Sequence, residues 1–478
     1  LNVSRCKINL YFPLNVRLFR FFLIILHAEF EMQLERSMKK RIFSGLLLGF
    51  MSIAAMAQVS NTLSPYSQFG LGVLSEQSQG FNHGMSGLAI GMRNGKIVNV
   101  QNPASYSAVD SLTMIFDVGV SGQITNFQEA NRKKNAKTAH FDYAVASFRL
   151  LPKIGFAFGV VPYSNIGYNY YSAAYNDLNL SATGAGSSYY NDVFEGSGGF
   201  SQAFVGFGWE LFKGFSFGAN FSYFWGKYDK TITIANSDSY VNTLTKSYST
   251  SVNSYKLDFG VQYQTAVSKN DVLTVGATLG VGHSLNGEAK LVTSNYNSVT
   301  GLASTSRDSV PDAFRLPFSF GVGASLVHNK RLTVGLDYQM QKWASIDYPV
   351  QTSNVTLEHN QGYQLVSGQL RDRHKVTLGT DWVPNPMGRK YLGHVHYRFG
   401  VSYATPYYNV NGVKGPRELT VSAGFGIPLV NSWNNRSTLN ISAQWVNKTA
   451  DNLIKENSFR LNIGLTFNER WFAKWKVD

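Results

Sequence analysis

The sequence predicts an all-β protein: a transmembrane antiparallel β-barrel of about 14 strands with an N-terminal plug, or hatch. Charged residues make up 15% of the chain, below the roughly 25% of ordinary soluble domains, while aromatic residues make up 14%. An export signal near residue 40 precedes the rest. From Leu112 onward apolar and polar residues alternate, which indicates strands with one lipid-facing side.

The export signal occupies residues 38–57. Met38-Lys39-Lys40-Arg41 is basic, an apolar run follows that is too short to span a bilayer, and Ala55-Met56-Ala57 is a small-x-small site. We predict a secretory signal peptide cut between Ala57 and Gln58; a buried helix or membrane anchor is the alternative.

Residues 1–37 precede this complete signal. The chain begins with Leu1, and a second basic and apolar segment in front of a signal peptide has little physical purpose. We expect an over-called start, with Met38 as the true first residue. The alternative is an anchor at residues 18–26, but Arg20 interrupts that run and it is short for a membrane span.

Residues 58–111 do not alternate and are rich in Gly, Ser and Asn. We predict a compact, partly helical hatch that plugs the lumen from the periplasmic side. The only cysteine, Cys6, lies upstream of the signal, so the exported part has no disulfide or cysteine metal site. The formal net charge is +14, but the basic residues are dispersed and export removes the usual nucleic acid, so we expect no nucleic-acid partner.

The barrel is predicted to occupy residues 112–478. Residues 112–124 and 141–151 read as the first two strands, with Arg132-Lys133-Lys134 in a basic loop between them. Residues 154–171 form the third strand, and Pro162 in its middle predicts a break or kink because proline cannot donate to the ladder. A loop rich in Ser, Gly and Tyr continues to about Gly198.

The same pattern of short turns and long polar loops repeats to the end of the chain, as in outer-membrane barrels. The remaining strands are expected at residues 200–212, 215–235, 255–267, 272–293, 314–328, 332–348, 371–383, 396–410, 418–429, 437–446 and 458–472.

The last strand alternates most clearly. Phe459, Leu461 and Ile463 are expected to face lipid, and the residues between them the lumen or a neighbouring segment. Trp471, Phe472 and Trp475 would supply an interfacial aromatic girdle. A terminal aromatic of this kind resembles the signal that the barrel assembly machinery recognises, although the tail continues beyond it.

Three patterns suggest other chemistry. Gly214-Phe215-Ser216-Phe217-Gly218 matches G-x-S-x-G, but the strand–turn–helix elbow that catalysis requires is missing. His394 and His396 would share one strand face, with His374 on the preceding strand, which makes a metal site conceivable and solvated histidines the simpler interpretation. Arg132-Lys133-Lys134 would either touch lipopolysaccharide phosphates or be solvated.

Three features together resemble the FadL/TodX family of outer-membrane transporters for long-chain fatty acids and other hydrophobic compounds. Asn102-Pro103-Ala104 is similar to the family's NPA motif at the end of the hatch, although Asn102 before a proline also simply starts turns. Pro162-Tyr163-Ser164-Asn165-Ile166-Gly167 lies where the family has an inward kink in the third strand. Residues 316–343 resemble its late hairpin, with Pro317, Asp337 and Trp343.

The resemblance implies passive uptake without a cofactor. A hydrophobic molecule such as a fatty acid would bind against the hatch, where Asn102, Pro103 and Ala104 anchor or gate it. It would leave sideways at Pro162, Tyr163, Ser164, Asn165 and Gly167. The family's apolar outer loop has no clear equivalent here. We expect a monomer in the outer membrane of a Gram-negative cell, in contact with lipid and lipopolysaccharide, and not an enzyme. A secretion scaffold or shuttle and a polar-solute porin are the alternatives.

Overall fold

The computed structural model describes residues 63–175, 189–352, 362–429 and 437–469. Contacts divide the chain into residues 1–58 and 59–478, and all described residues belong to the second unit. The predicted signal peptide, its cleavage site at Ala57 and Gln58, and the aromatic residues after Glu469 lie outside the described residues.

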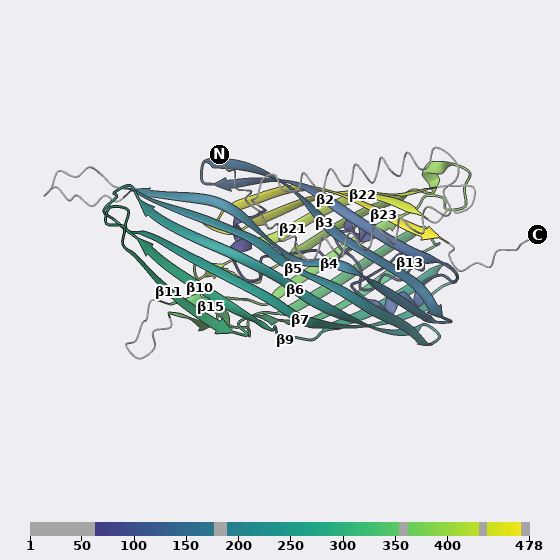
Figure 1. Cartoon of the computed structure of the whole chain (residues 1–478). Coiled ribbons are helices and arrows are strands. Elements are labelled where there is room, and N and C mark those ends of the chain that lie inside the picture. The colour runs from purple at the N-terminus through teal and green to yellow at the C-terminus, as the bar shows by residue number, and fades with distance from the viewer. Residues whose placement is uncertain (1–62, 176–188, 353–361, 430–436, 470–478) are drawn as a thin grey trace, which may run out of the picture. The chain divides into compact units, whose positions relative to one another are not determined.

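Fourteen antiparallel strands close into a barrel, because each pairs with its neighbours in order and the first, β2, pairs with the last, β23 (Figure 1). The predicted fold class and strand number are therefore confirmed. The barrel strands are β2 (Met114–Glu129), β3 (Arg132–Leu151), β4 (Ile154–Tyr175), β5 (Tyr189–Phe212), β6 (Phe215–Asn236), β7 (Thr243–Ala266), β8 (Asp271–Gly280), β13 (Phe318–His328), β14 (Leu332–Lys342), β17 (Arg373–Trp382), β18 (His396–Ala404), β21 (Arg417–Pro428), β22 (Thr438–Thr449) and β23 (Lys455–Glu469).

Shorter elements decorate this wall. β10 pairs with the outer part of β7, and β11 pairs with β10; β9 with β12, β15 with β16, and β19 with β20 form small separate ladders. Their bounds, with those of the helices and of β1, are η1 (Pro65–Gln68), β1 (Val73–Leu74), α3 (Gly80–His83), η2 (Pro103–Ala108), β9 (His283–Ser284), β10 (Gly287–Tyr296), β11 (Ala303–Pro311), β12 (Arg315–Leu316), β15 (Tyr348–Gln351), β16 (Tyr363–Val366), η3 (Tyr391–Gly393), β19 (Asn409–Val410) and β20 (Val413–Lys414).

Strand lengths divide the barrel into a tall side and a short side. β3 to β7 have 20 to 24 residues each, whereas β13 to β18 have 9 to 11. A tilted strand needs about 9–11 residues to cross a membrane, so the tall strands continue beyond its outer face. No helix among the described residues is long and apolar enough to cross a membrane.

Three predicted loops contain strands. Arg132, Lys133 and Lys134 begin β3, and only Ala130-Asn131 form the turn. Residues 189–198 belong to β5 and residues 243–254 to β7 rather than to long loops. These segments stand above the membrane on the tall side, where the outer face meets water instead of lipid and the strict apolar alternation is lost.

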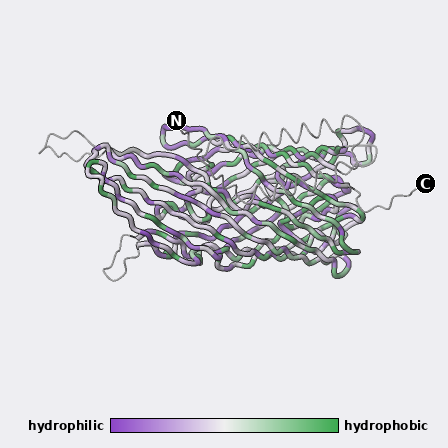
Figure 2. The backbone as a smooth tube through the Cα atoms, in the orientation of Figure 1, coloured by the Kyte–Doolittle hydropathy of each residue, from purple (hydrophilic) through white to green (hydrophobic). Residues whose placement is uncertain are grey.

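The alternation holds where the strands cross the membrane (Figure 2). In β23, Phe459 and Leu461 are exposed on the outside, while Ser458, Asn462 and Thr466 are buried inside. Residues 63–113 pack against these polar inner faces, and Figure 1 shows them enclosed by the strands.

The inner wall meets the hatch on glycines. At Gly400 in β18, a Cβ would lie 2.2 Å from the carbonyl carbon of Met85, and at Gly260 in β7 it would lie 2.1 Å from Oδ1 of Asn102. A side chain at either position would require the hatch to shift. The hatch body, residues 79–111, therefore rests directly on the wall.

An aromatic cluster fills the lumen beyond the hatch body, towards the outer ends of the strands. Its ring contacts include Trp343 with Tyr407, at 4.9 Å between centroids, and Tyr228 with Phe314, at 5.7 Å. Its buried members are Tyr66, Leu71, Tyr163, Ile166, Tyr168, Phe200, Phe224, Tyr228, Val252, Leu285, Ala289, Leu291, Ala313, Phe314, Leu316, Trp343, Ile346, Tyr363, Leu370, Tyr407, Tyr408 and Val410.

Candidate functional site: the hatch arm and the break between β3 and β4

The barrel wall is interrupted between β3 and β4. Their ladder starts beside the short turn at Lys153 and ends where Ala144 pairs with Val160. Beyond that point β3 continues to pair with β2, and β4 continues to pair with β5. The two strands therefore separate towards their outer ends, and each presents an edge to the other.

Pro162 lies two residues past the last ladder pair of β4. The β4–β5 register shifts between Pro162 and Ser164, which makes Tyr163 the extra residue of a bulge. Opposite this bulge Gly199 adopts φ +145°, and a Cβ there would lie 2.4 Å from the carbonyl oxygen of Ser164. A residue without an amide proton, a bulge and a glycine thus coincide where the wall separates.

The hatch arm, residues 63–78, covers the freed edge of β4. Its strand β1 pairs Val73 with Asn165 and Leu74 with Ser164. On either side of this short ladder, the carbonyl oxygen of Tyr163 accepts from the amide of Ser75 at 2.9 Å, and that of Gly167 accepts from the amide of Leu63 at 2.8 Å.

Side chains complete the seal. Nε2 of Gln77 donates to the carbonyl oxygen of Pro162 at 2.7 Å, and Oγ of Ser164 donates to that of Leu71 at 2.6 Å. All five residues proposed for the third-strand opening, from Pro162 to Gly167, therefore contact the arm. Whether this edge opens stays a prediction.

Aromatic hydroxyls hold the arm from its other side. Tyr348 donates to the carbonyl oxygen of Gly70 at 3.0 Å, and Tyr407 donates to that of Gly72. The hydroxyl of Tyr66, on the arm itself, donates to the carbonyl oxygen of Ile454 at 2.6 Å. The arm thus bridges the β4 edge and the aromatic cluster.

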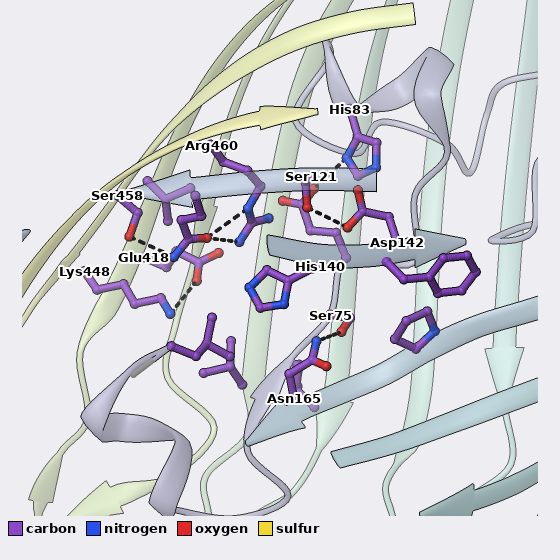
Figure 3. Close-up of a pocket in the computed structure, with 18 residues that line it drawn as sticks. Ser75, His83, Ser121, His140, Asp142, Asn165, Glu418, Lys448, Ser458 and Arg460 are labelled. Atoms are coloured by element: carbon purple, nitrogen blue, oxygen red, sulfur yellow. Dashed lines mark hydrogen bonds and ion pairs between the residues drawn. The ribbon is translucent and has the colours of Figure 1, made fainter. Parts of the chain in front are cut away.

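Two cavities flank β1. The β3 cavity, of about 60 Å³, lies between the arm, β2 to β4 and β21 to β23 (Figure 3). The β17 cavity, of about 80 Å³, lies between the arm, β14 and β17. Gln101, two residues before η2, also lines it. Both include Leu74, Ser75, Glu76 and Glu418 in their walls. Residues 74–76 of the arm therefore separate the two cavities.

Charged and polar side chains dominate both linings. The β3 cavity includes His83, Ser121, Gln123, His140, Asp142, Lys448, Ser458 and Arg460, and the β17 cavity includes Gln77, Gln101, Gln339, Gln341, Arg373 and Lys375. Arg460 donates from Nε and an Nη atom to Oε1 of Gln123, at 3.0 and 2.9 Å, and Oγ of Ser121 donates to Asp142 at 2.8 Å. These cavities suit a polar group better than a hydrocarbon chain.

Glu76 is the charged centre of the arm. Its carboxylate lies 3.4 Å from Nδ1 of His83 and accepts from Nε2 of Gln444 at 3.2 Å. Burial would raise the pKa of the Glu76 carboxyl, but the charge of Lys375, the hydrogen bond to His83 and the charge of Arg460 outweigh it and hold this pKa well below its usual range. The carboxylate is therefore ionised at neutral pH and ties the arm to its surroundings.

Asn102, Pro103 and Ala104 begin η2 in the hatch body. The buried Asn102 caps this helix by accepting from the amide of Ala104 at 3.2 Å, and Pro103 occupies the first turn. Nδ2 of Asn102 donates to the carbonyl oxygens of Ile90 at 2.9 Å and of Val261, in β7, at 3.2 Å. These contacts are those of an anchor, and a gating role stays a prediction.

Two buried carboxylates hold the rest of the hatch body. Oδ2 of Asp337 accepts from the amides of Ala89 and Ile90 at 2.7 and 2.8 Å. Tyr143 donates to Asp117 at 3.0 Å and accepts from the amide of Gly80 at 2.7 Å. Sequence reasoning noted Asp337 but missed its role, and it missed Glu76, Lys375 and Arg460. The detectable signal was charge at lumen-facing positions of alternating strands.

The conceivable metal site of His374, His394 and His396 does not form among the described residues. In the β17–β18 ladder Lys375 pairs with Ala404 at one end and Trp382 with Tyr397 at the other, so His374 and His396 lie at opposite ends. His396 contacts Asp381 at 2.9 Å, and His374 contacts the hydroxyl of Tyr338 at 2.9 Å. Ser216 of the G-x-S-x-G match is buried on β6 and accepts from Oγ of Ser107 at 3.0 Å.

Similarity to solved structures shows that this barrel has the fold of the FadL/TodX proteins. The Ralstonia pickettii toluene transporter TbuX matches with a TM-score of 0.54 and 13% identity, over 82% of this chain and 98% of its own. The Pseudomonas putida toluene transporter TodX matches with 0.54 and 14%, over 84% and 100%. A Pseudomonas aeruginosa FadL homologue matches with 0.53 and 11%, over 84% and 99%. At such identities the likeness extends to the fold alone.

The sequence assigns the family. Residues 38–478 match the model of the BamG family, so the chain belongs to that family. No curated protein matches the chain in sequence.

Proposed function

We propose that this chain is an outer-membrane channel for passive uptake of hydrophobic compounds, which leave sideways where β3 and β4 separate. The observation that supports it is β1, a strand of only two residues that continues the sheet at the free edge of β4. Release of the hatch arm would expose this edge and connect the cavities with the outside of the barrel. The hatch body, resting on the wall glycines, would stay in place.

The height of the break supports a lateral exit near the outer face. The ladder between β3 and β4 extends over eight residues of β3, from Ala144 to Leu151. At about 3.3 Å per residue and a tilt of about 40°, they cover about 20 Å of an apolar band about 25 Å tall. The break would therefore begin in the outermost part of the hydrocarbon layer.

The proposed cargo is an amphipathic molecule such as a long-chain fatty acid. Its chain would meet the aromatic cluster and its polar group the charged cavities beside β1. No step needs a cofactor or catalysis. We further propose a monomer that crosses the outer membrane of a Gram-negative cell many times, contacts lipid and lipopolysaccharide, and is inserted by the barrel assembly machinery.

A reversible lock on the arm tests the channel. Cysteines replacing Val73 and Asn165, which are ladder partners, would form a disulfide in a protein whose only cysteine is Cys6. Liposomes carrying the oxidised variant should take up labelled oleate at the background rate, and reduction should restore uptake. Cysteines replacing Leu336 and Leu378, exposed partners in the β14–β17 ladder, provide the control that should transport in both states.

Two results would contradict the proposal. Equal uptake by the oxidised and reduced lock variants would remove the arm from the route. No oleate uptake by the unmodified protein, despite a folded barrel, would remove fatty acids as cargo.

The aromatic cluster favours a second candidate, a scaffold or shuttle for exported proteins. Its rings fill the lumen beyond the arm, and Trp343, Phe314 and Tyr363 are almost completely buried. A packed core of this kind suits a protein that works through its outer surface. The filled lumen counts against a polar-solute porin. Failure of uptake together with recovery of a stoichiometric exported partner would favour the scaffold.

A further inference from the structure

The outer part of β3 is an open sheet edge. From Arg132 to Phe141 this strand pairs with β2 on one side, while its ladder with β4 begins only at Ala144. Among the described residues, no backbone hydrogen bond from another segment reaches this stretch on the side away from β2. This edge differs from that of β4, which the hatch arm covers.

The turn geometry identifies the free backbone groups. Ala130-Asn131 form a two-residue turn, so Glu129 and Arg132 are a hydrogen-bonded pair. The backbone groups of Arg132 therefore point towards β2. Because this direction alternates along a strand, Lys133 and every second residue after it point their N–H and C=O groups away from β2. These residues are Lys133, Asn135, Lys137, Ala139 and Phe141.

The edge stands in water. β3 has 20 residues and ends at a short turn after Leu151. About 10 residues suffice to cross the membrane, so residues 132–141 lie beyond its outer face. An open edge would be excluded inside hydrocarbon, but in water it is a template for a further strand.

Positive charge concentrates at this edge. Arg132, Lys133, Lys134 and Lys137 are all exposed, and none of them forms an ion pair with a described carboxylate. Such a concentration of one charge attracts acidic partners and accelerates their encounter.

We infer that the outer edge of β3 binds an extended acidic peptide segment by strand addition. Alternating free N–H and C=O groups match the backbone of another strand, and the lysines match its acidic side chains. Phosphates of lipopolysaccharide would engage the cations and the N–H groups but leave the C=O groups without donors. The inference is independent of the proposed channel, because it uses neither the lumen nor the hatch arm.

The test uses the purified full-length protein in nanodiscs without lipopolysaccharide. The probe is a fluorescent, end-blocked nine-residue peptide of alternating glutamate and valine, and binding is measured by anisotropy. Ala139→Pro removes one edge donor and obstructs an incoming strand, although its own N–H has no partner in the barrel. It should weaken binding at least tenfold, whereas Ala139→Val, which keeps the N–H, should leave binding within twofold.

A charge test uses a second variant that keeps the backbone intact. Lys133→Glu combined with Lys137→Glu should lose the acidic peptide and gain the corresponding peptide of alternating lysine and valine. Heat-modifiable electrophoretic mobility confirms that each variant forms a barrel. Equal binding to the Ala139→Pro and Ala139→Val variants would overturn strand addition. Failure of the acidic peptide to bind, together with saturable binding of lipopolysaccharide lost in the charge variant, would assign the edge to lipid phosphates instead.

Discussion

The two layers of the lumen are held in different ways. The hatch body meets the wall through backbone, at glycines such as Gly400, and through buried carboxylates such as Asp337. Within the aromatic cluster, large side chains pack on one another, and Trp343 is completely buried. The stability of the hatch body therefore depends on the exact positions of contacting atoms, whereas that of the aromatic cluster depends on the apolar area that it buries. The hatch arm lies between them and touches both.

The largest expected effect comes from filling a glycine position beneath the hatch body. Gly400→Val places side-chain atoms where the backbone of Met85 lies, and neither backbone can yield locally. We expect the hatch body to be expelled, and protease cleavage within residues 79–111 to report it. Gly122→Val is the control, because a Cβ at Gly122 meets nothing within 4 Å. Equal protection of both variants would contradict this view of the hatch.

The aromatic layer should respond to loss of area. Trp343→Ala removes a fully buried ring and should lower the free energy of unfolding by about 3–5 kcal/mol. Denaturant titration in detergent measures it, with the exposed Trp382→Ala as the matched control. The hatch body should stay protease-resistant. A hatch body cleaved as fast as in Gly400→Val would mean that the two layers are not separate.

Removing the carboxylate of Asp337 should cost somewhat less. Asp337→Ala leaves the amides of Ala89 and Ile90 without an acceptor, but it also removes the desolvation penalty of a buried carboxylate, so the net loss should be about 1–3 kcal/mol. Asp337→Asn keeps one acceptor oxygen and should be milder. Hydrogen exchange should become faster at these two amides and stay unchanged at the aromatic cluster. Identical behaviour of the Ala and Asn variants would argue against the hydrogen bonds as the cause.

The smallest expected effect is a weakening of the hatch arm at low pH. Because the pKa of Glu76 is lower in the folded protein than in the unfolded chain, ionised Glu76 stabilises the arm fully above its ordinary pKa of 4.5. This contribution is lost as the pH falls through the lowered pKa. We expect exchange protection of the β1 amides, corrected for intrinsic rates, to fall a few-fold below about pH 4. Glu76→Gln should remove the pH dependence; an unchanged dependence would place its origin elsewhere.

Sequence patterns predicted the barrel because lipid imposes a strict alternation on every strand that crosses it. The fourteen strands and the lipid face of β23 follow from that constraint. The same patterns predict loops for the outer parts of β3, β5 and β7, because water instead of lipid on the outer face removes the constraint. Strand register determines whether the histidines meet. His374 and His396 lie on neighbouring strands, but at opposite ends of the β17–β18 ladder.

The candidate site was only partly readable. Pro162 by itself predicts an edge or a bulge in its strand, because a proline has no amide proton to donate to a neighbouring strand. The partners of Glu76 come from segments far apart in the chain: His83 from the hatch, Lys375 from β17 and Arg460 from β23. No local spacing connects these residues, and only the closed barrel brings them to one carboxylate.

The pairing of β2 with β23 has a consequence for the order of folding. Met114 lies opposite Glu469, so the ring is completed only when the last strand of the chain reaches the first. The hatch body precedes β2 and touches the glycines on the inner wall without a gap. Passing it into a finished ring would require that wall to widen against its own ladder. We therefore expect the strands to wrap around the hatch, which makes the N-terminal segment a mould for the barrel that encloses it.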